Sequence, residues 1–458
     1  MTGNHINLGG KHMTQKTLLI QNGLLVTMNN QREIRNADIL VRGNRIEAIG
    51  NDLNITADET IDAQGMVVIP GLIQTHIHLT QSLFKGQADD LELMDWLKKK
   101  IWPLEGSHTY ESNYISAKLG IAELIKGGTT SIVDMETVNH TESALEAIME
   151  SGLRAHVGKC MMDYGTDVPA TLMEDTDYSI SESVKLLKAW HGKANGRISY
   201  AFAPRFVVSC TEKLLLKVRD LAKEYGVMVH THASENQGEI ALVERDRGMR
   251  NIIYLHKLGL TGENLILAHC IWLDDKEMKI LADTGTKICH CPNSNLKLAS
   301  GIAKIPELLE MGANVSLGAD GAPCNNNLDM FREMRSAALI HKARLFQPTV
   351  MPAHKVFELA TLGGAKAMGL EREIGSLEEG KKADIAIVDL GGIHVSPNKG
   401  GEIISQLVYS ATGQDVRTTV IDGKVVMRDR VLTTINEKEV MAEANRMISL
   451  HAKNAMVG

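Results

Sequence analysis

The pattern of apolar and polar positions changes twice along the chain. From Lys16 onward, short alternating runs ("TLLIQNGLLVTM", "ADILVRGNRIEAIG" and "ETIDAQGMVVIPG") are separated by Asn-Gly, Gly-Asn and Gln-Gly turn signals. The same pattern returns near the end in "ADIAIVDL" and "VRTTVIDGKVVMRDRVL". Short alternating runs divided by such turns predict β-hairpins. We therefore expect residues 14–69 and 375–435 to form one small β-sandwich from both ends of the chain, followed by a C-terminal helix at 436–458.

Between these flanks, apolar runs alternate with amphipathic helical stretches such as "TEKLLLKVRDLAKEYG" and "DDKEMKILADTG". The apolar runs lie at 67–78, 129–135, 153–161, 197–206, 226–235, 264–270, 286–292 and 313–321. Eight buried strands with helical crossovers in about 300 residues predict an α/β fold, a (β/α)8 barrel of the TIM type, over residues 70–374. A doubly wound open sheet is the alternative, but the glycine-rich turn expected after its first strand is absent.

The length and the net charge of the chain limit its domain organisation and its expected binding partners. A chain of 458 residues, 44% of them hydrophobic, exceeds one ordinary domain and fits a large core plus a smaller module. The formal net charge of −7 leaves no basic surface for nucleic acid or an anionic membrane, so a small molecule is the expected partner. Neither an apolar run of about 18 residues nor a signal-peptide pattern is present, which predicts a soluble, cytoplasmic protein. We also expect a homo-oligomer, and we set aside residues 1–12, which are polar and patternless.

Polar side chains recur where the predicted barrel strands end. In a (β/α)8 barrel, functional side chains lie at the carboxyl ends of the strands. The polar groups at those ends are His76 and His78 on the first strand, His232 and then Glu235 on the fifth, His269 on the sixth and Asp320 on the eighth. A single histidine on an apolar strand is usually a hydrogen-bonded core residue, which is the role we expect for His230. So many polar groups at one end of the barrel predict an active site.

These residues have the chemistry of a metal-dependent hydrolase. Imidazole and carboxylate groups suit Zn²⁺, with Fe²⁺ or Mn²⁺ as alternatives. We expect one divalent metal with a position left open for water, bound by His76, His78, His232 and Asp320. The metal lowers the pKa of that water and so provides a nucleophile at neutral pH. Asp320 is then placed to take up the proton of the water, His269 to hydrogen-bond the hydroxide and Glu235 to protonate the group under attack.

Several motifs together resemble a known family. "PGLIQTHIH", "HTHASEN", "LAHC", "HCPNSNLKLASGIA" and "LGADGAPCNNNLDMFREMR" are similar to the amidohydrolase superfamily, in the branch of hydrolytic deaminases and chlorohydrolases that act on purines and s-triazines. The closing "IGSLEEGKKADIAIVDL" resembles the same branch. The resemblance implies a mononuclear metal site with the four ligands above, and it implies that Glu235 and His269 are the proton-shuttling pair.

The resemblance also bears on the number of metals. Binuclear members of the superfamily bridge two metals with a modified lysine at the end of strand four. Here that strand reads "ISYAFAPRF" and has no lysine, so one metal is expected. Lys159, on the third strand, is the one nearby residue that could change this expectation.

The loop after the first strand is a candidate lid. It reads "LTQSLFKGQADDLELMDWLKKKIWPLE", and its Trp96 and Trp102 could cover a flat heterocycle or could be helix-core residues. The part "ADDLELMDWLKKKIWPLE" is similar to the deaminases of 5′-methylthioadenosine, S-adenosylhomocysteine and 5′-deoxyadenosine. By that similarity, Glu105 would accept hydrogen bonds from ribose hydroxyls.

Two residues favour a different substrate. Arg205 stands in "APRFVVSC" where the methylthioadenosine-type enzymes usually have histidine, and Gln81 and Arg205 together resemble the guanine-reading groups of guanine deaminases. A guanidinium only donates hydrogen bonds, so Arg205 favours a substrate with an acceptor, or else it forms a salt bridge beneath the lid. His290 is placed to touch the substrate, and Asp134 to orient a ligating histidine.

The favoured prediction is hydrolytic deamination of an adenine nucleoside, which gives the inosine analogue and ammonia. Guanine or 8-oxoguanine deamination is the first alternative, and an s-triazine amino- or chlorohydrolase is the second. A barrel without catalysis, acting as a binding module, is disfavoured because the set of ligands and proton carriers is intact. The zinc deaminases with Cys/His ligands use a different motif that the chain lacks.

Overall fold

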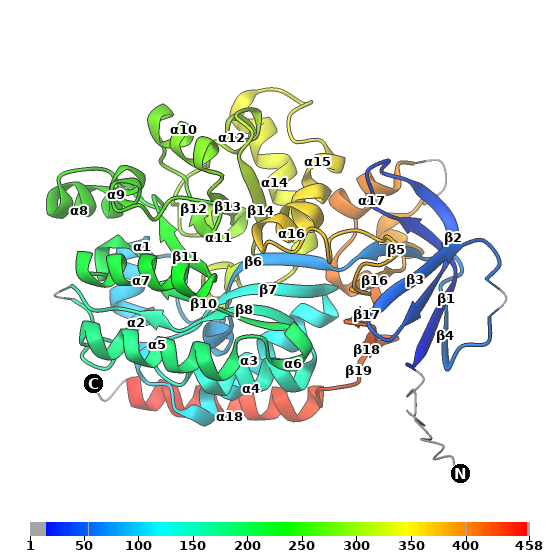
Figure 1. Cartoon of the computed structure of the whole chain (residues 1–458), viewed down its shortest axis with the longest axis horizontal. Coiled ribbons are helices and arrows are strands. Elements are labelled where there is room, and N and C mark those ends of the chain that lie inside the picture. The colour runs from blue at the N-terminus through cyan, green and yellow to red at the C-terminus, as the bar shows by residue number, and fades with distance from the viewer. Residues whose placement is uncertain (1–14, 54, 166, 399–400, 456–458) are drawn as a thin grey trace, which may run out of the picture.

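The computed structural model describes residues 15–53, 55–165, 167–398 and 401–455, so residues 1–12, set aside above, lie outside the described part. The chain forms two units, a barrel and a β-sheet beside it (Figure 1). Among the described residues, no helix has the length and apolarity needed to cross a membrane.

Eight parallel strands form the barrel. In chain order they are β6 (Leu72–His78), β7 (Thr129–Met135), β8 (Arg154–Gly158) with β9 (Cys160–Met161), β10 (Ile198–Pro204), β11 (Met228–Ala233), β12 (Leu265–His269), β13 (Lys287–His290), and β14 (Asn314–Leu317) with β15 (Asp320–Gly321). Each pairs in parallel with its neighbour, and the eighth strand closes the ring because β14 pairs with β13 while β15 pairs with β6. All residues of β6 and β7 are buried, as expected of strands covered on both faces. The predicted (β/α)8 barrel is therefore confirmed.

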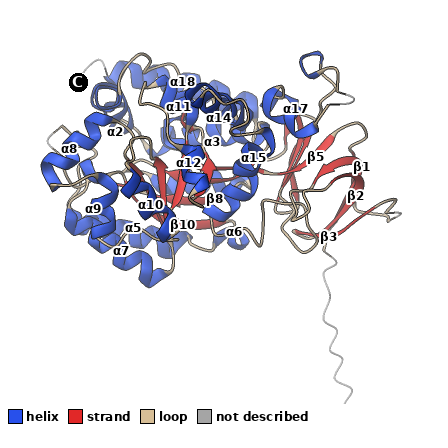
Figure 2. Cartoon of the chain, turned by 90° about the horizontal axis from the view of Figure 1, so that it is seen from above, coloured by secondary structure: helices blue, strands red, loops and turns tan. Residues whose placement is uncertain are grey.

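Helices surround the strands on the outside (Figure 2). The longer ones are α3 (Tyr110–Lys126), α4 (Thr141–Ser151), α5 (Thr176–Trp190), α7 (Glu212–Tyr225), α8 (Gln237–Arg247), α10 (Asp275–Thr284) and α14 (Met330–Leu345). The shorter ones include α6 (Lys193–Gly196), α9 (Asn251–Lys257), α11 (Pro292–Lys297), α12 (Ile305–Glu310), α13 (Ala322–Asn325), α15 (Ala353–Glu358) and α16 (Gly364–Ala367). Helix α7 shows why these stretches are helical: Thr211 caps its start by accepting from the N–H of Leu214, and Gly226 ends it with φ +65°.

Both ends of the chain join in the second sheet. Its strands are β1 (Thr17–Val26), β2 (Ile34–Arg42), β3 (Arg45–Gly50), β4 (Glu59–Asp62) and β5 (Val67–Pro70) from the beginning, and β16 (Ile385–Val388), β17 (Val416–Ile421), β18 (Lys424–Arg428) and β19 (Val431–Leu432) from the end. Strand β5 pairs with β1 on one side and β16 on the other, so hydrogen bonds connect all nine strands. The predicted hairpin turn joins β17 to β18 through Asp422 (φ +50°) and Gly423 (φ +76°).

The apolar run at 67–78 is divided between the two units, close to the boundary expected between residues 69 and 70. Its first part is β5 of the second sheet and its second part is β6 of the barrel. Gly71 lies between them, and a Cβ there would come within 2.1 Å of the Thr130 side chain. The backbone therefore passes from one unit to the other at the only residue type that fits the close approach.

A buried ion cluster joins the sheet to the barrel. Arg154, the first residue of β8, donates to both carboxylate oxygens of Asp384 (2.8 and 3.1 Å) and to Asp422 (3.2 Å). Asp384 and Asp422 belong to the C-terminal part of the second sheet, and all three side chains are at most 7% exposed. The sheet is thus anchored at the end of the barrel where the strands begin.

One further segment covers the other end of the barrel, and the C-terminal helix runs along its outside. After β6 the chain forms η1 (Leu79–Phe84) and then the predicted lid, made of α1 (Leu93–Trp96), η2 (Leu97–Ile101) and α2 (Trp102–Gly106). The C-terminal helix α18 (Glu437–Ala455) packs on α3 and η1, where Ala444 and Met447 contact Phe84 and Leu104 in one apolar cluster.

Candidate active site

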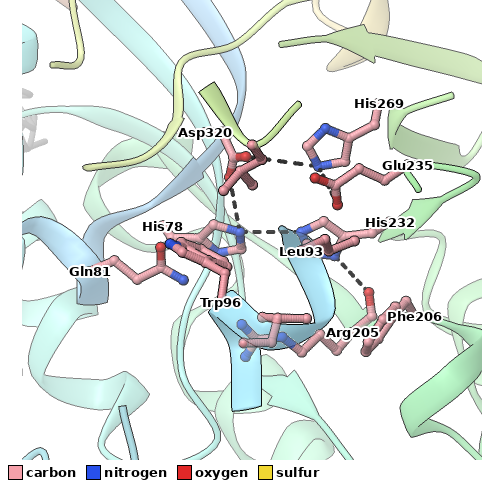
Figure 3. A pocket seen from close by; sticks show the side chains of 12 residues that line it. His78, Gln81, Leu93, Trp96, Arg205, Phe206, His232, Glu235, His269 and Asp320 are labelled. Atoms are coloured by element: carbon pink, nitrogen blue, oxygen red, sulfur yellow. Dashed lines mark hydrogen bonds and ion pairs between the residues drawn. The ribbon is translucent and has the colours of Figure 1, made fainter. Parts of the chain in front are cut away.

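A small cavity lies at the carboxyl ends of the barrel strands (Figure 3). It has a volume of about 30 Å³ and is lined by His78, Gln81, Leu93, Trp96, Leu97, Arg205, Phe206, His232, Glu235, His269, Leu298 and Asp320. One side is polar, and the other is an apolar wall that the lid provides through Leu93, Trp96 and Leu97.

The four residues predicted as metal ligands converge at this cavity. The imidazoles of His76, His78 and His232 offer nitrogen atoms that lie within 4.8 Å of one another. On the opposite side, Oδ1 of Asp320 lies 3.2 Å from Nε2 of His76 and 3.4 Å from Nε2 of His78. All four side chains are buried. Parallel strands bring these side chains together because their carboxyl ends meet at one end of the barrel.

The hydrogen bonds of two imidazoles show that this cluster fits a cation. Nδ1 of His78 lies 2.8 Å from the carbonyl oxygen of Met135, and Nδ1 of His232 lies 2.7 Å from that of Arg205. A carbonyl only accepts, so each Nδ1 carries the proton and each Nε2 presents a lone pair. Burial lowers the pKa of His78 to about 4 and holds that of His232 well below its usual value, so both rings are neutral.

The two lone pairs face each other with Nε2 atoms 3.2 Å apart, as the dashed line in Figure 3 shows. Two acceptors at this distance repel unless a cation lies against both of them. A divalent metal bound by imidazole nitrogen and carboxylate oxygen satisfies this requirement.

His230 lies two residues before His232 on β11 and contacts His76, one of the predicted metal ligands. Its Nε2 is 2.9 Å from Nδ1 of His76, and its side chain is fully buried. Burial and the neighbouring imidazoles hold its pKa well below the usual value. His230 therefore has a structural role, which is to hold the ring of His76 by a hydrogen bond.

Three groups on the polar side of the cavity can exchange protons. Nε2 of His269 lies 3.4 Å from Oε2 of Glu235 and 3.8 Å from Oδ2 of Asp320. Burial raises the pKa of Glu235 to about 7. Burial would also raise the pKa of Asp320, but the neighbouring imidazoles, with His76 first among them, hold it well below its usual range. Two carboxyl groups with pKa values on opposite sides of the usual range are suited to opposite roles in proton transfer.

The substrate residues predicted from the loop and strand four form a second buried cluster. Arg205 donates to both oxygens of Glu105, at 2.6 and 3.3 Å, and Gln81 donates to one of them at 2.7 Å. Both partners of this ion pair are at most 5% exposed. Arg205 lines the cavity and also forms the salt bridge beneath the lid, so its two predicted roles are compatible.

The structure places three of the predicted residues away from their expected contacts. Trp102 is not among the residues lining the cavity but packs in the apolar cluster of the lid, and Trp96 takes the lining position. His290 is also absent from the lining, because its Nε2 faces that of His341 on α14 at 3.3 Å. Asp134 accepts from the backbone N–H of Leu79 at 3.0 Å, and among the described residues no hydrogen bond joins it to a histidine.

Lys159 is occupied away from the imidazole cluster. Its Nζ lies 2.5 Å from Oε2 of Glu174 and 3.2 Å from the carbonyl oxygen of Cys160. Both side chains of the ion pair are almost fully buried. A lysine held in this way supplies no bridge between two metals, which agrees with the expectation of a single one.

Residues of α11 and the loop after it, which the sequence reasoning missed, touch the proton-exchanging groups. Oγ of Ser294 donates to Oδ2 of Asp320 at 2.6 Å, and Oδ1 of Asn295 lies 2.8 Å from Nδ1 of His269. Oγ of Ser300 donates to Glu235 at 3.4 Å. The only sequence signal was their position in "HCPNSNLKLAS", just after a barrel strand.

The sequence of the chain is similar to those of known proteins. The chain matches the amidohydrolase family over residues 67–426. It is 42% identical to a 5-methylthioadenosine/S-adenosylhomocysteine deaminase of Thermococcus onnurineus, over 91% of this chain and 95% of that protein. It is 39% identical to a 5'-deoxyadenosine deaminase of Methanobrevibacter smithii, over 95% of this chain and 98% of that protein.

A solved structure has the same fold. An adenosine deaminase from Xanthomonas campestris with bound zinc superimposes with a TM-score of 0.89 and 32% identity, covering 96% of this chain and 99% of that one. The fold, the convergent imidazoles and carboxylates, and the match over most of the sequence lead to one conclusion. The chain belongs to the amidohydrolase family.

Proposed function

We propose that the chain is a Zn²⁺-dependent hydrolytic deaminase of adenine nucleosides of the 5′-deoxyadenosine, 5′-methylthioadenosine or S-adenosylhomocysteine type. The observation that carries the proposal is the convergence of Glu235, His269 and Asp320 on one side of the cavity, opposite the imidazoles of His78 and His232. This arrangement supplies both a proton acceptor and a proton donor around one reacting carbon. The names of the relatives support the nucleoside substrate, and the zinc in the Xanthomonas campestris structure supports the metal.

Each polar residue has a distinct part in this proposal. His76, His78, His232 and Asp320 would hold the metal, which when bound would lower the pKa of a water beside it. Asp320 accepts a proton from the attacking water, while Glu235 donates a proton to the ring nitrogen next to the amino-bearing carbon. The amine takes the proton held by Asp320 and leaves as ammonia when the C–N bond breaks. The hydroxyl proton of the addition product returns to Glu235 through His269, so the enzyme is restored.

The lid and the second buried cluster would bind the rest of the nucleoside. Glu105 has four acceptor positions and uses three of them on Gln81 and Arg205, which leaves one for a ribose hydroxyl. Trp96 would lie against the flat heterocycle. Ligand sites usually exceed about 300 Å³, so the lid has to move outward to admit a nucleoside into a cavity of about 30 Å³.

Guanine or 8-oxoguanine deamination is the second candidate. Gln81 and Arg205 favour it, because both line the cavity and Oε1 of Gln81 has no hydrogen-bond partner among the described residues. Against it, the charge of Arg205 is already paired with Glu105. An s-triazine substrate would leave Glu105 without a hydroxyl to bind and is the weakest candidate.

The test is metal analysis combined with ammonia release from 5′-deoxyadenosine, methylthioadenosine, S-adenosylhomocysteine, guanine, 8-oxoguanine and melamine. We expect bound zinc and fastest release from an adenine nucleoside. Faster release from a free base would replace the nucleoside proposal with the guanine one. A protein without metal that releases ammonia from none of them is not a deaminase of this kind.

The proposal includes two further predictions, one about the oligomeric state of the protein and one about its location in the cell. A homo-oligomer would give a mass above that of one chain in light scattering behind size exclusion. A cytoplasmic enzyme acting on a small heterocycle would be recovered in the cytosolic fraction of cells. A monomer, or recovery with membranes, would contradict the corresponding prediction.

A further inference from the structure

Helix α11 presents three consecutive polar residues with different partners. Ser294 donates to Oδ2 of Asp320 at 2.6 Å, and Asn295 receives Nδ1–H of His269 at 2.8 Å. The first residue of the three, Asn293, points away from the cavity and contacts helix α14. The short helix therefore holds two of the proton-exchanging groups from behind and is itself held by its first turn.

Two side chains of α14 make this contact. Oγ of Ser336 donates to Oδ1 of Asn293 at 2.5 Å, and the carboxylate of Glu333 accepts the other bonds. Oε1 of Glu333 accepts from Nδ2 of Asn293 at 2.6 Å, and its Oε2 accepts from the backbone N–H of Asn293 at 3.3 Å. Helix α11 lacks a side-chain cap of its own, since Cys291 at the N-cap position makes no such bond. Glu333 thus supplies from another helix the acceptor that a cap residue would normally provide.

Glu333 also reaches Asp320 by a second route. Nδ2 of Asn325 donates both to Oε1 of Glu333 at 2.7 Å and to the carbonyl oxygen of Ala319 at 2.8 Å. Ala319 immediately precedes Asp320, whose backbone has φ +63° in the left-handed region that a non-glycine residue rarely adopts. A backbone in that conformation persists only where its surroundings hold it there.

We propose that Glu333 is a positioning residue for proton transfer, which sets the orientation of His269 and Asp320 through α11 and Asn325 without touching the substrate. Glu333 is completely buried and accepts only from neutral amide groups. Its Oε1 accepts from both Asn293 on α11 and Asn325, whose amide also donates to Ala319. The inference rests on the proposed deaminase function for its kinetic consequence, but its structural content is independent of the substrate.

The test is Glu333→Gln, which keeps the size of the side chain. One oxygen becomes an NH2 group that faces the backbone N–H of Asn293, so a hydrogen bond is replaced by a contact between two donors. Loss of such a supporting contact typically costs 10- to 100-fold, so we expect kcat to fall by about 10- to 100-fold with KM changed by less than about twofold. The metal content should stay as in the wild type, because the three imidazoles keep their own partners.

A matched control separates positioning from stability. Glu277 is equally buried and accepts from Nε of Arg250 at 2.8 Å and from the N–H of Ile252 at 3.3 Å, and neither partner lines the cavity. Glu277→Gln should lower the melting temperature and leave kcat per bound metal unchanged. The double variant Glu333→Gln with Asn293→Asp restores a bond between the two side chains but turns an NH2 group toward Nδ2 of Asn325, so it should recover only part of the lost kcat.

A second readout does not depend on turnover. In protein labelled with ¹⁵N-histidine, the nitrogen shifts of His269 should show a proton fixed on Nδ1 in the wild type and a mixture of tautomers in Glu333→Gln, with and without added Zn²⁺. Unchanged shifts together with wild-type kcat per bound metal would overturn the proposal, whatever the melting temperature. If the wild type releases no ammonia at all, the deaminase function fails, and the shifts alone decide whether Glu333 orients His269.

Discussion

The barrel carries a buried polar cluster at each end, and the two clusters differ in how fully their charges are paired. At the end where the strands begin, Arg154 places a guanidinium between Asp384 and Asp422, and every contact is a hydrogen bond of 2.8 to 3.2 Å. At the other end, the lone pairs of His78 and His232 face each other at 3.2 Å. The first cluster is complete within the protein, whereas the second requires a cation from outside.

The segments that close the two ends of the barrel also differ, because one makes polar contacts and the other makes apolar contacts. The second sheet closes the Arg154 end with backbone and ion-pair contacts, such as the bond from the N–H of Gly71 to the carbonyl oxygen of Asp384 at 2.9 Å. The lid closes the other end with the apolar side chains of Leu93, Trp96 and Leu97. Apolar contacts are non-directional, so α1 and η2 can shift without leaving buried polar groups unpaired, as long as Glu105 on α2 stays paired with Arg205. The second sheet is thus held in a fixed position on the barrel, whereas the lid can open to admit a ligand.

The largest expected effect tests the catalytic end. Asp320→Asn removes a metal ligand and the proton acceptor at once, while Ser294 can still donate to the remaining amide oxygen. We expect kcat to fall by about 10³-fold or more, measured as ammonia release per bound metal. The melting temperature should change little, because the side chain keeps its volume. Turnover near the wild-type rate would remove Asp320 from the proposed chemistry.

The next effect tests the end where the strands begin. Arg154→Met leaves Asp384 and Asp422 buried without a cation, which should cost about 3–5 kcal/mol in the free energy of unfolding. The measurement is denaturation by urea, with kcat per folded molecule expected to remain at the wild-type value. As a control, Arg45→Met breaks the half-exposed pair with Glu373 and should change stability little. An equal loss of unfolding free energy in both variants would show that the buried Arg154 cluster stabilises the fold no more than an exposed ion pair does.

Sequence patterns predicted the barrel and the site for a common physical reason. Burial on both faces makes a barrel strand an uninterrupted apolar run, so the run at 129–135 coincides with β7 residue for residue. Once the strands are located, the barrel geometry brings their carboxyl ends together, which was enough to group His76, His232 and Asp320. The division of residues 67–78 between two sheets lies at Gly71, close to the boundary expected between residues 69 and 70, although burial is the same on both sides of it.

Contacts made by loops could not be predicted in this way. Asn295, the partner of His269, lies in the short helix α11, and Glu174, the partner of Lys159, lies in a loop. Both segments follow barrel strands, and periodicity does not record the path they take. The choice between Trp96 and Trp102 as the lining residue depends on how the lid helices turn, and both residues are equally apolar and buried. The pattern of a helix gives its buried face but not which of its buried residues meets a cavity.

A smaller effect concerns pH. Asp134 and Glu136 lie close together behind His78, and burial raises the pKa of both, that of Glu136 to about 7. The folded protein therefore holds a proton that the unfolded chain releases, and the free energy of unfolding falls as the pH rises from about 4.5 to about 7. Glu136→Gln, whose amide oxygen still accepts from Asn113, lacks this loss and should be more stable than the wild type by about 1–3 kcal/mol at pH 8.

The same exchange at the other end of the barrel should have the opposite sign. Asp422→Asn removes a carboxylate that Arg154 neutralises, so it should lower the free energy of unfolding at pH 8. Urea denaturation of both variants at pH 5 and pH 8 measures the difference. Destabilisation by Glu136→Gln at pH 8 would mean that Glu136 is ionised and paired in the folded protein.

The smallest expected effect concerns the lid alone. Trp96 lines the cavity and Trp102 packs behind it, and the ring nitrogens of both have no hydrogen-bond partner among the described residues. Trp96→Phe shrinks the surface offered to the heterocycle and should raise KM by up to about 10-fold with little change in kcat. Trp102→Phe removes the same volume from the lid core, so it should lower the melting temperature and leave KM unchanged. A rise in KM with Trp102→Phe alone would return that residue to the substrate site and show that the lid closes differently over a bound nucleoside.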